Sequence, residues 1–137
     1  MHLLVLLLFS VDLTAVKNEP NLEHRSELAI ANANTALDAA REAYSAGDAD
    51  KTAKELDEVS ESVDVAYEAL SATGKDPRKS PRYFKKAEMA VRTLLRRLEG
   101  VSQSFSVSDR EKIDAIRNHI SEVHDNLVQG IMSKKKK

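Results

Sequence analysis

Histidines and closely spaced carboxylates are the residues of this chain whose types and spacing could do chemistry. His119 and His124 lie five residues apart within a helical pattern, so they fall on opposite flanks of that helix. Two metal ligands on one helix lie three or four residues apart on the same face. The chain also has no cysteine, which excludes thiolate ligands and disulfides. The sequence therefore predicts neither a metal site nor a cofactor.

Two pairs of carboxylates are spaced four residues apart, Asp57 with Glu61 and Asp64 with Glu68. General acid–base catalysis requires one member of such a pair to be desolvated, with a raised pKa. All four acids lie on the helix face opposite the apolar residues, where water solvates them. We interpret them as an acidic stripe that is either simply solvated or matched by positive charge, from the basic third helix of the chain or from a bound cation or cationic partner.

Nucleophilic and phosphate-binding motifs are also missing from the sequence. No serine stands in a Gly-x-Ser-x-Gly context, and the four glycines form no phosphate-binding loop. We therefore predict that the protein is not an enzyme.

Basic residues are concentrated in one predicted helix, and they form the most distinctive surface that the sequence offers. This candidate anion-binding or partner-binding set comprises Arg82, Lys85, Lys86, Arg92, Arg96 and Arg97. One interpretation is a solvated face that acidic residues elsewhere in the chain neutralise. A second is a binding site for an anionic partner, such as lipid headgroups, an acidic polymer or an acidic protein. A third is nucleic acid, although only Tyr83 is available nearby for stacking on bases.

The net charge of −1 hides a strong polarity along the chain. Residues 21–74 contain 4 Lys/Arg and 12 Asp/Glu, whereas residues 75–100 contain 9 Lys/Arg and 3 Asp/Glu. The segments therefore carry net charges of −8 and +6. The chain as a whole has no field that would attract nucleic acid or membranes, so any electrostatic binding must be local.

The N-terminus contains an unbroken apolar run at residues 3–9. Seven residues rise about 10 Å as a helix, which is too short to cross a membrane. The run matches the hydrophobic region of a secretory signal peptide, with Ala15 as a small residue at the cleavage site. No Lys or Arg precedes the run, and one explanation is that the natural start lies upstream. The alternative is a core helix or strand; we predict export to the periplasm or secretion.

Helix-terminating and helix-starting residues divide the remainder into four predicted helices, at residues 21–46, 48–73, 80–100 and 108–133. Asn21 and Asp48 are expected N-caps, and Gly47 and Gly74 are expected C-terminal breakers. Ser80 before Pro81 is a typical start, and Ser108 with Glu111 matches a capping box. Each helix has one apolar face, and the expected core contains Leu56, Val63, Leu94, Leu98, Ile116 and Ile120.

The short connections favour antiparallel neighbours, because there is little chain to cross over. The predicted fold is all-α, an antiparallel four-helix bundle built from two helical hairpins after an N-terminal apolar leader. The domain boundaries follow as a signal peptide at 1–15, a linker at 16–20, one bundle domain at 21–133 and a basic tail at 134–137.

The segment 40–70 has a helix, then Ala46-Gly47-Asp48, then a second amphipathic helix. It resembles the helical hairpins of tetratricopeptide-like proteins, although the chain has no 34-residue self-repeat. In composition the whole chain resembles the small, uncharacterised exported helical proteins of bacteria. The first resemblance implies a helical hairpin, and neither implies a catalytic site.

Three functions are compatible with these observations. The first is an exported, non-catalytic helical module that binds a protein partner. The second is a binder of anionic polymers or membrane surfaces through the basic helix. The third is a cytoplasmic nucleic-acid-binding protein, which would require residues 3–9 to belong to the core.

Overall fold

The computed structural model describes residues 12–133, and all regular structure within them is helical. Five α-helices and one short 3₁₀ helix follow one another along this part of the chain. They are α2 (Leu13–Lys17), α3 (Leu22–Ser45), α4 (Ala49–Ala72), α5 (Arg82–Ser104), η1 (Val107–Asp109) and α6 (Glu111–Met132). The expectation of an all-α protein is confirmed.

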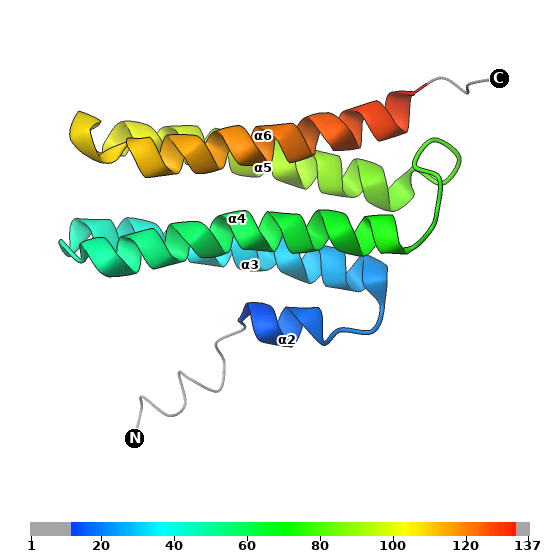
Figure 1. Cartoon of the computed structure of the whole chain (residues 1–137), viewed down its shortest axis with the longest axis horizontal. Coiled ribbons are helices and arrows are strands. Elements are labelled where there is room, and N and C mark those ends of the chain that lie inside the picture. Colours follow the sequence, from blue (N-terminus) through cyan, green and yellow to red (C-terminus); the bar gives the residue numbers. More distant parts are fainter. Residues whose placement is uncertain (1–11, 134–137) are drawn as a thin grey trace.

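The four long helices pack side by side as a helical bundle (Figure 1). Helix α3 packs along α4, and α5 packs along α6. The two pairs meet through contacts of α4 with α6 and of α3 with α5. The short helix α2 lies on the α3–α4 pair, on the side away from α5 and α6 (Figure 1). One surface of α5 and α6 therefore remains uncovered by any other described element.

The caps of α3 and α4 are those that the sequence predicts. The side chain of Asn21 accepts a hydrogen bond from the backbone N–H of His24 at 2.9 Å, and Asp48 does the same for Lys51 at 3.0 Å. Gly47 and Gly74 have φ angles of 77° and 72°. Only glycine adopts this left-handed conformation without a steric cost, so both glycines end their helices where predicted.

The predicted start and end of the third helix are wrong. Helix α5 begins at Arg82 with Pro81 at the N-cap position, and no side chain caps it. Ser80 instead donates its backbone N–H to the carbonyl of Asp76 at 2.8 Å, as part of the preceding turn. The helix continues past Gly100 to Ser104 because Val101 and Ser102 are buried, and this packing overrides the helix-breaking tendency of glycine.

The predicted capping box at the start of the last helix is also wrong. Residues Val107–Asp109 form the 3₁₀ helix η1, and α6 begins at Glu111 without a side-chain cap. The carboxylate of Asp109 accepts hydrogen bonds from the hydroxyls of Tyr44 and Ser106 at 2.8 and 2.7 Å. Contacts with a distant helix therefore decide the structure of this connection.

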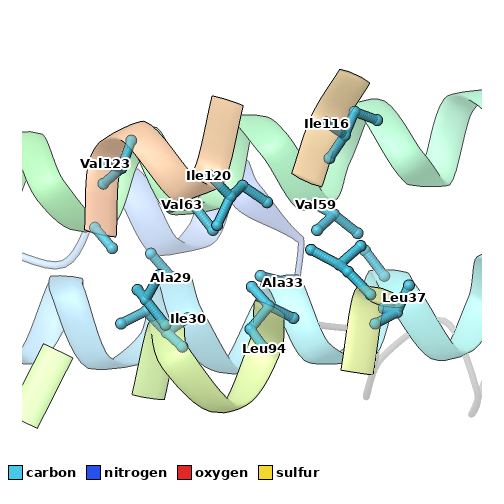
Figure 2. Close-up of a cluster of buried hydrophobic side chains, with 14 of the residues drawn as sticks. Ala29, Ile30, Ala33, Leu37, Val59, Val63, Leu94, Ile116, Ile120 and Val123 are labelled. Carbon is cyan, nitrogen blue, oxygen red and sulfur yellow. The ribbon is translucent and has the colours of Figure 1, made fainter. Parts of the chain in front are cut away.

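The core runs the length of the bundle between the two helix pairs. Figure 2 shows its central part, where Leu37 of α3, Val59 and Val63 of α4, Leu94 of α5 and Ile120 of α6 lie together. The six core residues predicted from the sequence are all buried (Leu56, Val63, Leu94, Leu98, Ile116 and Ile120). Burying each such side chain contributes about 1.5–3 kcal/mol relative to leaving it exposed.

Helix α2 extends this core to the other side of the α3–α4 pair. Leu13 and Val16 are 6% and 1% exposed, and the Lys17 Nζ lies 3.5 Å from an oxygen of Glu61 on α4. The first two residues of the predicted 16–20 linker belong to α2, and Val16 is buried in the core. The apolar run at 3–9 and the basic tail at 134–137 lie outside the described residues.

The length and hydropathy of the helices bear on membrane insertion. Between residues 12 and 133, no helix combines the length and the apolar composition that a membrane span requires.

Candidate interaction surface

The basic residues of α5 occupy two separate surfaces of that helix. Helix α5 turns Phe84, Leu94 and Leu98, among others, into the core, which fixes its rotation about its own axis. Four of the six predicted basic residues then fall on the outer surface at alternating spacings of three and four, with Met89 among them. We call this set the outer row, and its exposed members are Arg82, Lys85, Met89, Arg92 and Arg96.

The other two predicted residues, Lys86 and Arg97, point toward α3 and are neutralised there. Lys86 forms an ion pair with Glu27. Arg97 forms an ion pair with Asp38, and it also donates to the side-chain oxygen of Asn34 at 2.6 Å. This flank of α5 therefore stabilises the contact between the helix pairs, and is less available to an external anion than the outer row.

The pKa of Glu27 reflects this neutralisation. The hydrogen bond from Lys86 holds the pKa of the Glu27 carboxyl below its usual value, against a partial desolvation that raises it. A similar pair precedes α5, where the Lys75 Nζ lies 2.6 Å from an oxygen of Glu23. Acidic residues of α3 thus contact basic residues in and before α5. For these cations, this agrees with the interpretation that acidic residues elsewhere in the chain neutralise the basic face.

Within the outer row, Arg92 has a partner on its own helix. It donates two hydrogen bonds to Glu88, at 2.9 and 2.7 Å, and Glu88 also lies 2.7 Å from the Nε2 of His124 on α6. The hydrogen bond from Arg92, supported by His124, lowers the pKa of Glu88 although its partial burial acts in the opposite direction. Arg92 keeps further N–H donors for other acceptors, because a guanidinium carries five.

The remaining cations of the outer row (Arg82, Lys85 and Arg96) have no acidic partner within residues 12–133. The guanidinium of Arg82 lies 5.2 Å from the ring centroid of Tyr83, a cation–π distance. Among residues 12–133, neither Lys85 nor Arg96 takes part in an ion pair. The outer row therefore presents a line of positive charge that other residues of this part of the chain leave largely uncompensated.

A groove between α5 and α6 borders the outer row. We call it the α5–α6 groove, and it is lined by Lys85, Glu88, Met89 and Arg92 from α5 and by Val128, Ile131 and Met132 from α6. Met89 and Met132 are 59% and 75% exposed. Basic side chains thus stand on one side of a mostly apolar groove.

The acidic stripe of α4 is exposed to water, as predicted, but three of its four acids also contact a basic side chain of another helix. Asp57 lies 2.8 Å from the Nζ of Lys112, and Asp64 lies 2.7 Å from the Nε2 of His119, so both contact α6. Glu61 pairs with Lys17 of α2, as described above. Glu68 is exposed and forms no ion pair with any residue of the described part of the chain. Three of the four predicted acids therefore link α4 to its neighbours.

The two histidines of α6 face different helices, in agreement with their spacing. His119 contacts Asp64 of α4, and His124 contacts Glu88 of α5. Within residues 12–133, no cluster of three or more His, Asp or Glu side chains has the geometry to hold a metal ion.

Sequence reasoning missed the contribution of Val128 and Met132 to the groove. Met89 stood out as an exposed apolar residue among cations, and the predicted antiparallel hairpin brings the last turns of α6 alongside the start of α5. Which side chains of α6 border Met89 depends on how the two helices are rotated against each other, and the structure supplies that information. No protein family, curated protein or solved structure matches this chain.

Proposed function

We propose that the protein is a non-catalytic helical interaction module that binds a protein partner through the outer row of α5 and the adjacent α5–α6 groove. The observation that supports this most directly is the outer row itself, in which Arg82, Lys85 and Arg96 are exposed without an acidic partner in residues 12–133. Charged and apolar groups that lie side by side on an exposed surface are typical of binding sites.

The scaffold for this surface is an antiparallel four-helix bundle of two hairpins, α3 with α4 and α5 with α6. A bundle of this kind holds α5 in a fixed orientation, because its inner face is packed along its whole length. The outer row then presents its side chains on a straight and rigid element, which lowers the entropic cost of binding a partner.

Export to the periplasm or secretion is part of the proposal, and it depends on the apolar run at residues 3–9. Cleavage after Ala15 would divide α2 and remove Leu13, which is buried with Val16. Cleavage before Asp12 would leave α2 intact, together with the hydrogen bond from the Ala15 N–H to the Asp12 side chain. N-terminal mass spectrometry of the protein from its native host tests export and distinguishes the two positions.

Site-specific photo-crosslinking in the native host tests the proposed surface. A benzophenone amino acid replaces Met89 in the outer row, and in a control strain it replaces Thr35, which is exposed on α3. We expect a discrete crosslinked product from position 89 that position 35 does not give. The product should disappear when Arg82→Glu and Arg96→Glu are added. Equal products from both positions, or none from position 89, would overturn the proposal.

Binding to anionic polymers or membrane surfaces is the second candidate, and the same uncompensated cations of the outer row favour it. Such binding would release counterions and would weaken steeply with salt. Sedimentation with phosphatidylglycerol vesicles at low and high salt distinguishes this candidate from a protein partner, and duplex DNA in the same assay tests nucleic acid.

A further inference from the structure

We propose that the α5–α6 groove receives an amphipathic helix of the partner, with an apolar stripe beside an acidic one. This inference rests on the proposed function and specifies the chemistry of the partner. It follows from three properties of the groove: its exposed apolar side chains, the row of cations along one side, and its position between two long helices that pack along each other.

The groove gathers most of the large apolar side chains that are exposed in the described part of this protein. Three large apolar side chains are strongly exposed in residues 12–133, namely Met89, Val107 and Met132. Two of the three, Met89 and Met132, line this one groove, where the half-buried Val128 and Ile131 extend the apolar surface. Covering them removes apolar surface from water, which is favourable in proportion to its area. Methionine side chains are flexible and adapt to the shape of a binding partner.

The cations determine the charge of the partner. The outer row extends from Arg82 to Arg96, about 21 Å at 1.5 Å per residue. One acidic group in the groove, Glu88, is already bound by Arg92 and His124. It therefore does not offset the charge of the neighbouring Lys85, which forms no ion pair within residues 12–133. Charge complementarity therefore favours carboxylates on the partner, along the side that faces α5.

The arrangement of the two properties determines the shape of the partner. Apolar side chains of α6 form one wall of the groove, and cations of α5 stand on the other. A helix with apolar residues at positions i, i+3, i+4 and i+7 and acids on the adjacent flank matches both walls at once. A planar anionic membrane would reach the protruding cations without filling the space between the helices.

The test uses the full-length protein labelled with ¹³C at its methionine methyl groups. The probe is a synthetic peptide of about 18 residues, or five helical turns, with leucines in a helical stripe and glutamates on one flank of it. A second peptide has the same composition in an order that gives no amphipathic helix. We expect the first peptide to shift the methyl signals of Met89 and Met132, assigned with Met89→Leu and Met132→Leu, and the second to leave them unchanged.

Two variants and two matched controls locate the binding site. Lys85→Glu reverses an exposed charge in the groove, and Met132→Ser removes an exposed apolar side chain, so neither disturbs the core. We expect each to weaken peptide binding about tenfold, which is the effect of 1.4 kcal/mol. The controls are Lys54→Glu on α4 and Val107→Ser in η1, which make the same charge reversal and a comparable loss of an exposed apolar side chain outside the groove and should leave binding unchanged.

Other outcomes would overturn the inference in distinguishable ways. Equal binding of both peptides would show that charge alone is recognised, and the helical shape is not. Binding of phosphatidylglycerol vesicles or duplex DNA, with no binding of the amphipathic peptide, would assign the cations of the outer row to a membrane or to nucleic acid and leave the groove without a role. Failure of the peptide while photo-crosslinking from position 89 succeeds would remove the acidic helix and leave the proposed function intact. Failure of both would remove the proposed function as well.

Discussion

Tyr44 and Phe105 stack ring on ring, with their centroids 3.9 Å apart and their planes 11° from parallel. Tyr44 lies at the end of α3, and Phe105 follows the last residue of α5. The Tyr44 hydroxyl also accepts a hydrogen bond from the backbone N–H of Ser106 at 2.9 Å and donates one to Asp109 at 2.8 Å. This contact fixes the connection between α5 and α6 against the first helix pair.

We expect Phe105→Ala to destabilise the fold by about 3–5 kcal/mol, because Phe105 is buried and its removal leaves a cavity under Tyr44. Tyr44→Phe should cost less, because the stacked rings remain and only the hydroxyl contacts are lost. Urea unfolding followed by circular dichroism measures both values. A coupling energy near zero in the cycle of Tyr44→Ala and Phe105→Ala would contradict a direct contribution from stacking.

A buried polar pair connects α3 with α4. The Nδ2 of Asn32 donates to Ser62 Oγ and to Glu58 Oε2, both at 2.9 Å, and Asn32 and Ser62 are almost fully buried. Since a polar group left unpaired in a core is costly, this pair favours one register of the two helices over others.

We predict that Asn32→Ala lowers the free energy of unfolding by about 1–3 kcal/mol, because it leaves the buried Ser62 hydroxyl without its partner. The double variant Asn32→Ala, Ser62→Ala should lose less free energy of unfolding than the sum of the losses in the two single variants. The reason is that the double variant leaves neither member of the pair buried without its partner. The control is Asn118→Ala, an exposed residue of α6 expected to change stability by less than about 0.5 kcal/mol. Additive effects of the two buried changes would show that the hydrogen bond contributes nothing.

The helical content, the core and the caps of the first two long helices could be predicted because each depends on neighbouring residues. Asn21 and Asp48 cap their helices through backbone groups three residues away, and apolar spacing alone identifies residues such as Leu94 and Ile120. The sequence around Ser80 and Ser108 predicts N-caps just as strongly, but neither side chain caps a helix. At both positions the chain forms other hydrogen bonds, and near Ser108 these involve Tyr44, more than 60 residues distant.

The candidate site could be predicted only in part for the same reason. Helical spacing identifies the cations of α5, but it does not reveal that Lys86 and Arg97 meet acids of α3. Nor does it reveal that Met89 and Met132 line one groove. The predicted antiparallel hairpin brings these helix ends near each other, but the rotation of each helix about its axis decides which side chains meet. The sequence therefore contains the residues of the surface, whereas the packing decides which of them remain available.

The hydrogen bonds of Glu88 with Arg92 and His124 predict how the stability of the fold depends on pH. The pKa of Glu88 is lowered in the folded protein, chiefly by its hydrogen bond with Arg92, so ionised Glu88 stabilises the fold. This contribution is fully present above the carboxyl's ordinary pKa of 4.5 and disappears as the pH falls through the lower folded value. Glu88→Gln should therefore lower the urea midpoint at pH 7, and its difference from the parent protein should shrink below about pH 4.

One control variant accompanies the titration of Glu88. Glu122→Gln changes an exposed carboxylate of α6 that forms no ion pair with residues 12–133, so its stability should follow that of the parent protein at every pH. A Glu88→Gln deficit that persists unchanged at pH 3 would contradict an electrostatic origin and would indicate a loss of packing.

The last prediction concerns α2 and the start of the folded domain. Leu13 and Val16 are both buried against α3 and α4, and Asp12 caps the helix that holds them. A chain that begins at Val16 loses Leu13 and the cap, whereas a chain that begins at Asp12 keeps both. We expect the shorter chain to be less stable by about 2 kcal/mol or more, because burial of a leucine alone contributes that much.

Leu13→Ala in the full-length chain should reproduce most of this loss, and Thr14→Ala, at an exposed position of the same helix, should not. Thermal and urea unfolding of the four proteins measure the differences. Equal stability of the chains that begin at 12 and at 16 would show that α2 is not needed by the fold. Under the proposal of export, a leader that ends at Ala15 would then have no cost in stability, whereas the expected loss would favour a leader that ends before Asp12.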